Sequence, residues 1–427
     1  MIVTGQAGTG KSVLISQIAA YESNSVILLA PTGVAATNIN GSTIHSALGL
    51  PLNTKQISMK GEKLRNLQAR WKNIKTVVVD EMSMISSLML NLIDQFMRQV
   101  FPDKNDVIFG DRSVLLFGDF LQLPPVANKP MFTIDGPGFV AYRSFDHVVE
   151  LTQIMRQSQN EIQFVELLQR ARLGILNVAD WNLLNTRCQG IVDPVSILHL
   201  FATNESVSNH NLTILPSLQQ PFINIKATHG GSGLTTDASD LAGNLQGELL
   251  LCCDSKVMLT TNLSTKHGLV NGAIGTVQRI VFNPGTAPPS LPQFVVVSFP
   301  SYKGPQFYLP NCVPIQPITR SYEKDGGTCT RKQLPLTLAF GVTIHKSQGM
   351  SLRQAVIDIG EKDFSAGLTY VALSRLRTLD GLFLPNQLNF SRLSNLGNSD
   401  GAKASKKEQE RLTECSRATE EKYRKSS

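Results

Sequence analysis

The sequence predicts an α/β protein built on a doubly wound parallel sheet. Continuous apolar runs, such as SVILLA at 25–30, alternate with segments of helical periodicity, such as KSVLISQIAAYE at 11–22. Strands covered on both faces have this continuous apolar character, and their alternation with helices is typical of parallel sheets. Ligands in such sheets bind beyond the carboxyl ends of the strands. Charged residues of this sequence follow directly after the apolar runs, where a ligand would bind.

The composition is that of a globular protein with a basic balance. The 427 residues are 42% hydrophobic and 17% charged, with a formal net charge of +7. A positive balance suits a polyanionic partner, nucleic acid above all. The longest apolar runs have about five residues, too few for a membrane-spanning helix, so no membrane partner is expected. The six cysteines form no C-x-x-C pair, and we interpret them as reduced thiols of an intracellular protein.

The predicted elements follow in a regular order. A strand at 1–4 leads into GQAGTGKS, and a helix follows over 11–22. Four more apolar runs predict strands at 25–30, 76–84, 113–126 and 147–153. A second α/β segment is predicted from the runs at 197–211, 255–262, 336–352 and 354–360. Between 272 and 335, short β-like runs alternate with Pro and Gly turns, which indicates a small inserted β-barrel.

The segment 5–12, GQAGTGKS, matches the phosphate-binding pattern G-x-x-x-x-G-K-[ST] at every fixed position. In this pattern, backbone N–H groups and the N-terminus of the following helix bind phosphate. Lys11 is expected to reach the β- and γ-phosphates, and Ser12 to coordinate Mg²⁺. The predicted nucleotide-binding residues are Gly5, Gln6, Ala7, Gly8, Thr9, Gly10, Lys11 and Ser12.

Further residues suit the hydrolysis of a nucleoside triphosphate. In VVVDE, Asp80 can hold Mg²⁺ and Glu81 can orient and deprotonate the attacking water. Gln122, in GDFLQLPP, can sense the γ-phosphate or position water. Arg156 and Arg375 can stabilise the negative charge of the transition state. The candidate catalytic residues are Lys11, Glu81, Gln122, Arg156 and Arg375.

These motifs belong to an ordered series: GQAGTGKS, APTGVAATNINGSTIHSALG, VVVDEMSM, LLFGDFLQLPPV, LTQIMRQ, VMLTTN…GLVNGAIGTV, LAFGVTIHKSQGMSL and YVALSR. The series closely resembles the petite-integration-frequency family of superfamily I DNA helicases, including the versions carried by Helitron transposons. The resemblance spans about residues 1–385. GDFLQLPPV and IHKSQGMSL point to this family and its bacterial RecD relatives rather than to helicases at large.

The resemblance implies an ATP-dependent DNA helicase that translocates 5′-to-3′ on single-stranded DNA. Such an enzyme unwinds duplex or forked DNA in repair, recombination, telomere or genome maintenance. ATP and Mg²⁺ would bind between two RecA-like domains, with Gln348 completing the nucleotide site. We expect a monomer, located in the nucleus or mitochondrion if the source is eukaryotic.

The resemblance also assigns DNA contacts, at Thr32, Gly33, Thr43, His45, Phe120, Thr343, His345 and Lys346. The two histidines are donors that can bond phosphate oxygens, and Lys346 adds charge. Phe120 offers a ring on which a base could stack. None of these contacts reads base sequence, as a translocating motor requires.

The domain boundaries follow from the same resemblance. The first RecA-like domain is expected at 1–155, with a small wedge at about 48–73. The second is expected at 156–276 and 336–395, interrupted by the β-barrel at 277–335. Residues 396–427 are charged and nearly free of large apolar residues, so a flexible or loosely helical tail is predicted.

One departure concerns the beginning of the chain. Family members carry, upstream of the P-loop strand, a helix with a glutamine that reads adenine, and here only four residues precede Gly5. Gln6 lies inside the phosphate loop and cannot replace that glutamine. We therefore expect an N-terminally truncated chain with an uncovered edge on its first sheet, poor solubility and weak preference for ATP over GTP.

Two alternatives remain open beside the helicase. A P-loop kinase or GTPase shares the phosphate loop, but the sequence lacks the guanine-reading N-K-x-D, and neither class needs HKSQG. The other alternative is a truncated, transposon-derived remnant that binds nucleic acid with little or no unwinding. ATP turnover measured with and without single-stranded DNA separates these possibilities.

Overall fold

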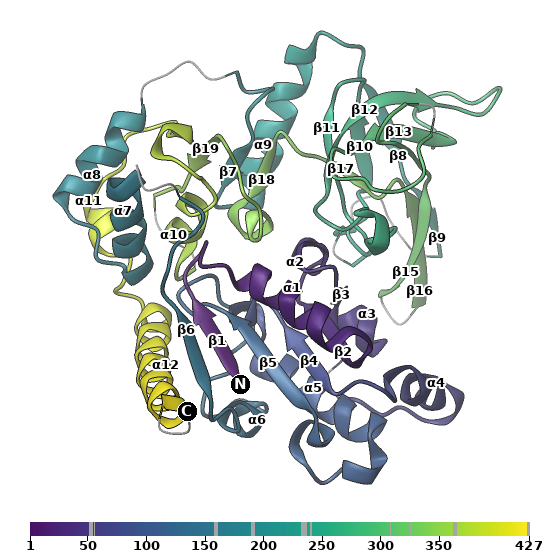
Figure 1. Cartoon of the computed structure of the whole chain (residues 1–427). Coiled ribbons are helices and arrows are strands. Elements are labelled where there is room, and N and C mark those ends of the chain that lie inside the picture. The colour runs from purple at the N-terminus through teal and green to yellow at the C-terminus, as the bar shows by residue number, and fades with distance from the viewer. Residues whose placement is uncertain are drawn as a thin grey trace. The chain divides into compact units, whose positions relative to one another are not determined.

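The computed structural model (Figure 1) describes residues 1–424 except 51–53, 55, 158–160, 189–192, 232–236, 240, 308, 325–326 and 362–364. It divides into two compact units. Unit 1 comprises Met1–Gln189, Gln348–Arg353 and Ile359–Ser427, and unit 2 comprises Gly190–Ser347 and Gln354–Asp358. This division differs from the boundary expected at 155, because the helices after that point pack within unit 1.

Unit 1 is organised by a six-stranded sheet whose strand pairs are all parallel, in the order β3-β2-β4-β5-β1-β6. The strands are β1 (Ile2–Gly5), β2 (Val26–Ala30), β3 (Ser42–Thr43), β4 (Thr76–Val79), β5 (Ser113–Gly118) and β6 (Val148–Leu151). The α/β parallel sheet predicted from the alternating pattern is therefore confirmed.

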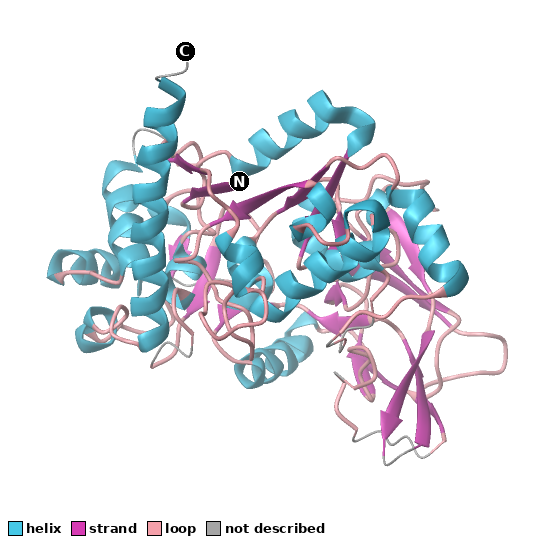
Figure 2. Ribbon diagram, turned by 90° about the horizontal axis from the view of Figure 1, so that it is seen from below, coloured by secondary structure: helices cyan, strands magenta, loops and turns pink. Residues whose placement is uncertain are grey.

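Helices cover both faces of this sheet (Figure 2). On one face, Val3, Val78 and Phe117 pack with Ile15 of α1 (Lys11–Glu22) and with the alanines of α2 (Gly33–Asn38). On the other face, strand residues pack with α5 (Ser87–Val100), where Phe96 is fully buried. Successive strand residues point to opposite faces, so an apolar run fills both layers.

The strands end earlier than the apolar runs suggested. β4 ends at Val79 rather than at 84, and β5 at Gly118 rather than at 126. The residues that follow leave the ladder at the carboxyl edge of the sheet. This edge therefore carries Asp80, Glu81 and Gln122, in the position where parallel sheets bind ligands.

The remaining short elements of unit 1 are helices and the strand β20, which does not belong to this six-stranded sheet. They are α3 (Ile44–Leu48), α4 (Gly61–Trp71), α6 (Phe139–Arg143), α7 (Ile162–Leu173), α8 (Val178–Asn185), α10 (Leu368–Leu373), α11 (Phe390–Ser394) and β20 (Leu382–Phe383). α7 contacts α10, and α8 contacts α11. The segment expected as a wedge contains α4, whose Trp71 packs edge-to-face on Phe96; its residues 51–53 and 55 lie outside the described part of the chain.

Residues 400–424 form a helix, α12 (Asp400–Arg424), that lies along the edge strand β6 (Figure 1). Of the two predicted forms of the tail, the flexible one is therefore wrong and the helical one agrees with the structure. Thr419 Oγ1 accepts a hydrogen bond from Val148 N at 3.1 Å, and Ser416 Oγ accepts one from Glu150 N at 3.1 Å. The expectation of an uncovered sheet edge is therefore also wrong at β6. The outward N–H groups of this edge strand are bonded to hydroxyls of α12.

Unit 2 combines a small parallel sheet with antiparallel sheets. β7 (His199–Phe201) lies between β18 (Gly341–Thr343) and β19 (Ala355–Asp358), with parallel pairing on both sides, and α9 (Asn204–Ile214) packs on β18 and β7. Leu200 and Ile357 are fully buried in these strands. This sheet corresponds to the second α/β segment expected from the sequence.

The antiparallel part of unit 2 is larger than the predicted insertion. A five-stranded sheet runs β14-β13-β12-β11-β17, a second runs β15-β16-β9, and β10 pairs with β8. The strands are β8 (Ile223–Lys226), β9 (Thr228–Gly230), β10 (Glu248–Leu251), β11 (Lys256–Leu259), β12 (Ile274–Val281), β13 (Phe294–Ser298), β14 (Cys312–Ile315), β15 (Ile318–Lys324), β16 (Gly327–Gln333) and β17 (Leu336–Leu338). The five-stranded sheet thus uses strands on both sides of 277–335.

Among the described residues, no helix combines the length and the apolar character needed to cross a membrane.

Candidate active site

The phosphate loop joins β1 to α1 at the carboxyl edge of the sheet of unit 1. Gly8 and Gly10 adopt φ values of 85° and 87°, which side chains with a Cβ disfavour. A Cβ on Gly8 would also lie 2.6 Å from the Cβ of Arg156. Position 8 therefore requires glycine for two reasons, the backbone conformation and the close approach of Arg156, which the sequence predicted to belong to the same site.

Lys11 begins α1, and its ammonium group lies over the loop. Its Nζ donates hydrogen bonds to the carbonyl oxygens of Gly5 at 2.5 Å and Gln6 at 2.8 Å. Burial lowers the pKa of Lys11, while the carboxylates of Asp119, Glu81 and Asp80 oppose that shift. An anion bound in the loop would provide the counter-charge that favours the ammonium form.

Asp80 and Glu81 follow β4 directly. The Asp80 carboxylate accepts a hydrogen bond from Glu81 N at 2.8 Å, and burial, with the neighbouring Glu81, raises the pKa of Asp80 to about 7. Glu81 has φ 53°, an uncommon conformation for a residue with a side chain. Its Oε2 accepts a hydrogen bond from Gln348 Nε2 at 3.0 Å. Gln348, which lies 267 residues later, therefore orients the carboxylate expected to act as the base.

The two arginines are held at one helix end. Arg156 Nη1 donates to the carbonyl oxygen of Ser374 at 2.8 Å. Arg375 is 2% exposed, and its Nε and Nη2 donate to Val371 O and Ser374 Oγ, both at 2.8 Å. Burial and the nearby Arg156 lower the pKa of Arg375 to about 10, so the guanidinium remains charged at neutral pH.

One pocket of about 460 Å³ collects most of these residues. It is lined by Ala7, Gly8, Thr9, Gly10, Lys11, Ser12, Val13, Ala35, Asn38, Asp80, Glu81, Gln122, Met155, Arg156, Gly349, Ser351, Arg375 and Arg377. Gly5, Gln6 and Gln348 contact this lining through hydrogen bonds. The pocket brings together every residue that the sequence assigned to catalysis.

The residues present fit a magnesium ion. Ser12 and the buried carboxylate of Asp80 line the same pocket, and both offer the oxygen ligands that Mg²⁺ prefers. Among the described residues, no cluster of three or more His, Cys, Asp or Glu side chains could hold a metal by itself.

Comparisons with known proteins give one consistent result. The sequence model of the family described as PIF1-like helicase matches residues 1–181. The ATP-dependent DNA helicase PIF1 of Mus musculus is 32% identical over 398 residues, which cover 89% of this chain. The relative of the same name in Xenopus laevis is 33% identical, also over 89% of this chain.

Solved structures agree with this result. The Pif1 helicase from Candida albicans is 27% identical with a TM-score of 0.74, covering 92% of each chain. Bacteroides Pif1 bound to ssDNA is 27% identical with a TM-score of 0.73, covering 92% of this chain and 90% of the other. This chain belongs to the PIF1-like helicase family. It spans 56% of the mouse relative and 58% of the frog relative.

The expected DNA contacts of this PIF1-like chain fall in both units. In unit 1, Thr32 and Thr43 cap the N-termini of α2 and α3, accepting hydrogen bonds from Ala35 N and Ser46 N. Gly33 is buried at the first position of α2, and His45 is half-buried on α3. In unit 2, Thr343 ends β18, followed by half-buried His345 and exposed Lys346. Burial lowers the pKa of His345, so its imidazole is a neutral donor at pH 7.

The structure does not support the expected stacking of a DNA base on Phe120. Its side chain is 4% exposed and packs edge-to-face on Phe132, with ring centroids 5.0 Å apart, and on Tyr142 at 6.0 Å. A ring enclosed in this way has no face on which a base could stack. The GDF stretch therefore contributes Phe120 to the core, and the large apolar side chain satisfies packing rather than binding.

The pocket also contains residues that sequence reasoning missed. Asn38, Ser351 and Arg377 line it, and Asn38 Nδ2 donates to the carbonyl oxygen of Gly349 at 3.0 Å. Arg377 follows Arg375 by two residues in SRLR, which was the available signal. Asn38 and Ser351 offered no comparable signal, because single polar residues are common after helices and in loops.

Proposed function

We propose that this chain is an ATP-driven DNA helicase motor that moves 5′-to-3′ along single-stranded DNA and opens forked or partial duplexes. The observation that carries the proposal is the single pocket lined by the phosphate loop, the acidic pair, Gln122 and two arginines. The names of its relatives, which are ATP-dependent DNA helicases, support the same activity.

Each group of the pocket has a role in phosphoryl transfer. The loop N–H groups and Lys11 would bind the phosphates, and Ser12 with Asp80 would hold Mg²⁺, which neutralises phosphate charge. Glu81, oriented by Gln348, would accept the proton of the attacking water. Gln122 would position that water. Arg156 and Arg375 would stabilise the charge that develops on the γ-phosphate. The remaining described pocket groups are neutral apart from Arg377, which adds a further positive charge.

DNA binding would use the residues at the helix N-termini of unit 1 and those after β18 of unit 2. The proposed groups are hydroxyl, backbone, imidazole and cationic groups, all suited to phosphates, from Thr32, Gly33, Thr43, Thr343, His345 and Lys346. His45 joins this set. Because such contacts ignore base identity, the motor would bind with little sequence preference. We further propose that the strands of 277–335 act as a barrel-like accessory domain, that the motor is a monomer, and that a eukaryotic source would place it in the nucleus or mitochondrion.

Turnover of ATP with and without single-stranded DNA tests this proposal. DNA-stimulated hydrolysis together with strand separation from a 5′-tailed fork is the expected result. Binding of DNA without ATP turnover would instead indicate the non-catalytic remnant. Turnover that ignores DNA would contradict a helicase and favour another P-loop enzyme.

A further inference from the structure

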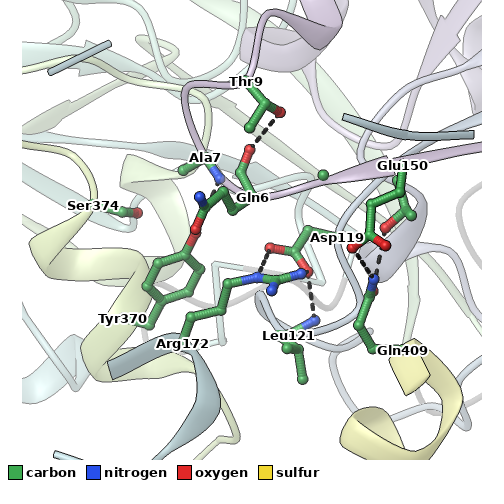
Figure 3. A network of polar contacts seen from close by, with 12 residues as sticks. Gln6, Ala7, Thr9, Asp119, Leu121, Glu150, Arg172, Tyr370, Ser374 and Gln409 are labelled. Atoms are coloured by element: carbon green, nitrogen blue, oxygen red, sulfur yellow. Dashed lines mark hydrogen bonds and ion pairs between the residues drawn. The ribbon is translucent and has the colours of Figure 1, made fainter. Parts of the chain in front are cut away.

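Tyr370 of α10 contacts the phosphate loop directly. Its side chain is 2% exposed, and its hydroxyl accepts a hydrogen bond from Ala7 N at 3.0 Å (Figure 3). Ala7 lines the nucleotide pocket. One backbone N–H of the loop is thus held by a phenol that lies 363 residues later in the chain. No role was assigned to this tyrosine by the sequence motifs or by the pocket lining.

The C-terminal turn of the same helix, which directly follows Tyr370, holds the arginines. α10 ends at Leu373, and the guanidinium of Arg375 folds back onto Val371 O and Ser374 Oγ. Arg156 is bonded to the carbonyl oxygen of Ser374. The last turn of α10 therefore fixes both candidate transition-state arginines, while Tyr370, on the same helix, fixes the distance of that turn from the loop.

The surroundings keep the Tyr370 hydroxyl neutral and in place. Asp119 is fully buried and forms a bidentate ion pair with Arg172, at 2.8 and 2.9 Å (Figure 3). Burial, followed by the charge of Asp119, raises the pKa of Tyr370 to about 12. The phenol therefore remains protonated at physiological pH. Asp119 Oδ1, which accepts a hydrogen bond from Arg172 Nη2, also accepts one from Leu121 N.

We propose that Tyr370 is a positioning residue for ATP hydrolysis, which ties the phosphate loop to the helix end that carries Arg375. This inference rests on the proposed function. Ground-state binding depends on the remaining loop N–H groups and Lys11, which Tyr370 does not touch. The arginine acts on charge that develops only in the transition state. Loss of the tie therefore lowers kcat and leaves KM nearly unchanged.

Tyr370→Phe in the full chain tests the proposal, since it removes one oxygen and keeps the ring. Tyr21→Phe is the matched control, because Tyr21 is 92% exposed on α1 of the same unit. We expect kcat to fall by about 10- to 100-fold, the range that a small misplacement of a catalytic group can cost. KM and the affinity for a fluorescent ATP analogue should stay within about twofold, and the control should match the wild type.

A double-variant cycle shows whether Tyr370 acts through the arginine. In an Arg375→Ala background, measured in single turnovers, Tyr370→Phe should cause a clearly smaller further loss, because only Arg156 then remains to be positioned. An equal loss in both backgrounds, an unchanged kcat, or a parallel loss of analogue affinity would each overturn the proposal. A wild-type chain without ATP turnover would refute the proposed function itself, whereas an active wild type with an unaffected Tyr370→Phe variant refutes only this inference.

Discussion

At the scale of single residues, the pocket is lined by side chains that lie far apart in the sequence and that have different expected roles. Lys11 and Ser12 come from the loop after β1, and Asp80 with Glu81 from the end of β4. Arg375 comes from the segment after α10. These groups converge because parallel strands and their following loops share one edge of the sheet.

Hydrolysis should depend on Lys11, Glu81 and Arg375. Lys11→Ala, Glu81→Gln and Arg375→Ala should each lower the rate of ATP turnover by about 100- to 1,000-fold, the usual cost of removing a preorganised transition-state group. Glu81→Gln is the most informative, because a glutamine can still accept the hydrogen bond of Gln348 but cannot take a proton. Steady-state kinetics on folded protein checks this prediction.

The matched control is Glu62→Gln, which makes the same change on the exposed surface of α4. It should leave turnover unchanged. Near-normal hydrolysis by folded Glu81→Gln would remove Glu81 from the mechanism and require another base.

A second prediction at this scale concerns His210 of α9. Its ring lies 4.1 Å from that of His199, and burial, followed by the neighbouring His199, lowers the pKa of His210 to about 4. Well above pH 6.5, the His210 imidazole is neutral in both the folded and the unfolded state. As the pH falls from 6.5 toward 4, His210 binds a proton in the unfolded state but not in the folded state, so the free energy of unfolding decreases.

The melting temperature should therefore fall between pH 6.5 and 4, and His210→Gln should flatten this part of the profile. Thermal unfolding at several pH values measures the effect. His45→Gln serves as the comparison, because His45 belongs to unit 1 whereas both histidines of the ring pair belong to unit 2. An identical pH profile for wild type and His210→Gln would contradict the prediction.

At the scale of elements, α12 completes unit 1 by bonding the edge strand of its sheet. Gln409 of α12 accepts a hydrogen bond from Thr4 Oγ1 at 3.2 Å, one residue before the phosphate loop begins. Its Nε2 donates to Glu150 Oε1 at 3.4 Å (Figure 3). The helix thus protects the N–H groups of β6 and supports the strand that carries the loop.

Thr419→Val should destabilise unit 1, because the change keeps the shape and removes the acceptor of the buried Val148 N–H. An unsatisfied buried N–H costs about 1–3 kcal/mol. Thr413→Val is the matched control, since the Thr413 hydroxyl bonds only within the helix, to Gln409 O at 3.1 Å. Thermal unfolding should show a lower Tm for Thr419→Val alone. Equal effects of the two changes would mean that the hydroxyl does not serve the sheet edge.

At the scale of the whole molecule, the net charge of +7 and the proposed single-strand track predict salt-dependent binding. If about five phosphates are neutralised, a plot of the logarithm of the binding constant against the logarithm of the salt concentration should have a slope of about −3.5, from about 0.7 per phosphate. Fluorescence anisotropy with oligonucleotides of different sequence, at several salt concentrations, measures both slope and sequence preference. A slope near zero would contradict a charged track.

Unwinding should require a 5′ tail. Each base-pair step costs about 1.4 kcal/mol of stacking to open, so strand separation must be coupled to ATP. Forks that carry only a 5′ or only a 3′ tail distinguish the two directions, with the Lys11→Ala variant as the inactive reference. Preference for the 3′ tail would refute the proposed polarity.

The sequence by itself determined the parallel sheet and the chemistry of the pocket. Local signals sufficed, because the phosphate loop is one contiguous segment and Asp80 follows its strand directly. The sequence could not reveal the links between Gln348 and Glu81 or between Tyr370 and Ala7, since such pairs are set only when distant segments pack.

The tertiary structure alone decided the role of α12 and the burial of Phe120. The buried face of α12 consists mainly of Ser405, Gln409, Ser416 and Thr419, with Leu412 as its large apolar residue. Residues 400–424 therefore have no apolar periodicity from which a packed helix could have been predicted. Its polar side chains are buried because the edge strand of a sheet presents unpaired N–H groups, which hydroxyl and amide oxygens satisfy.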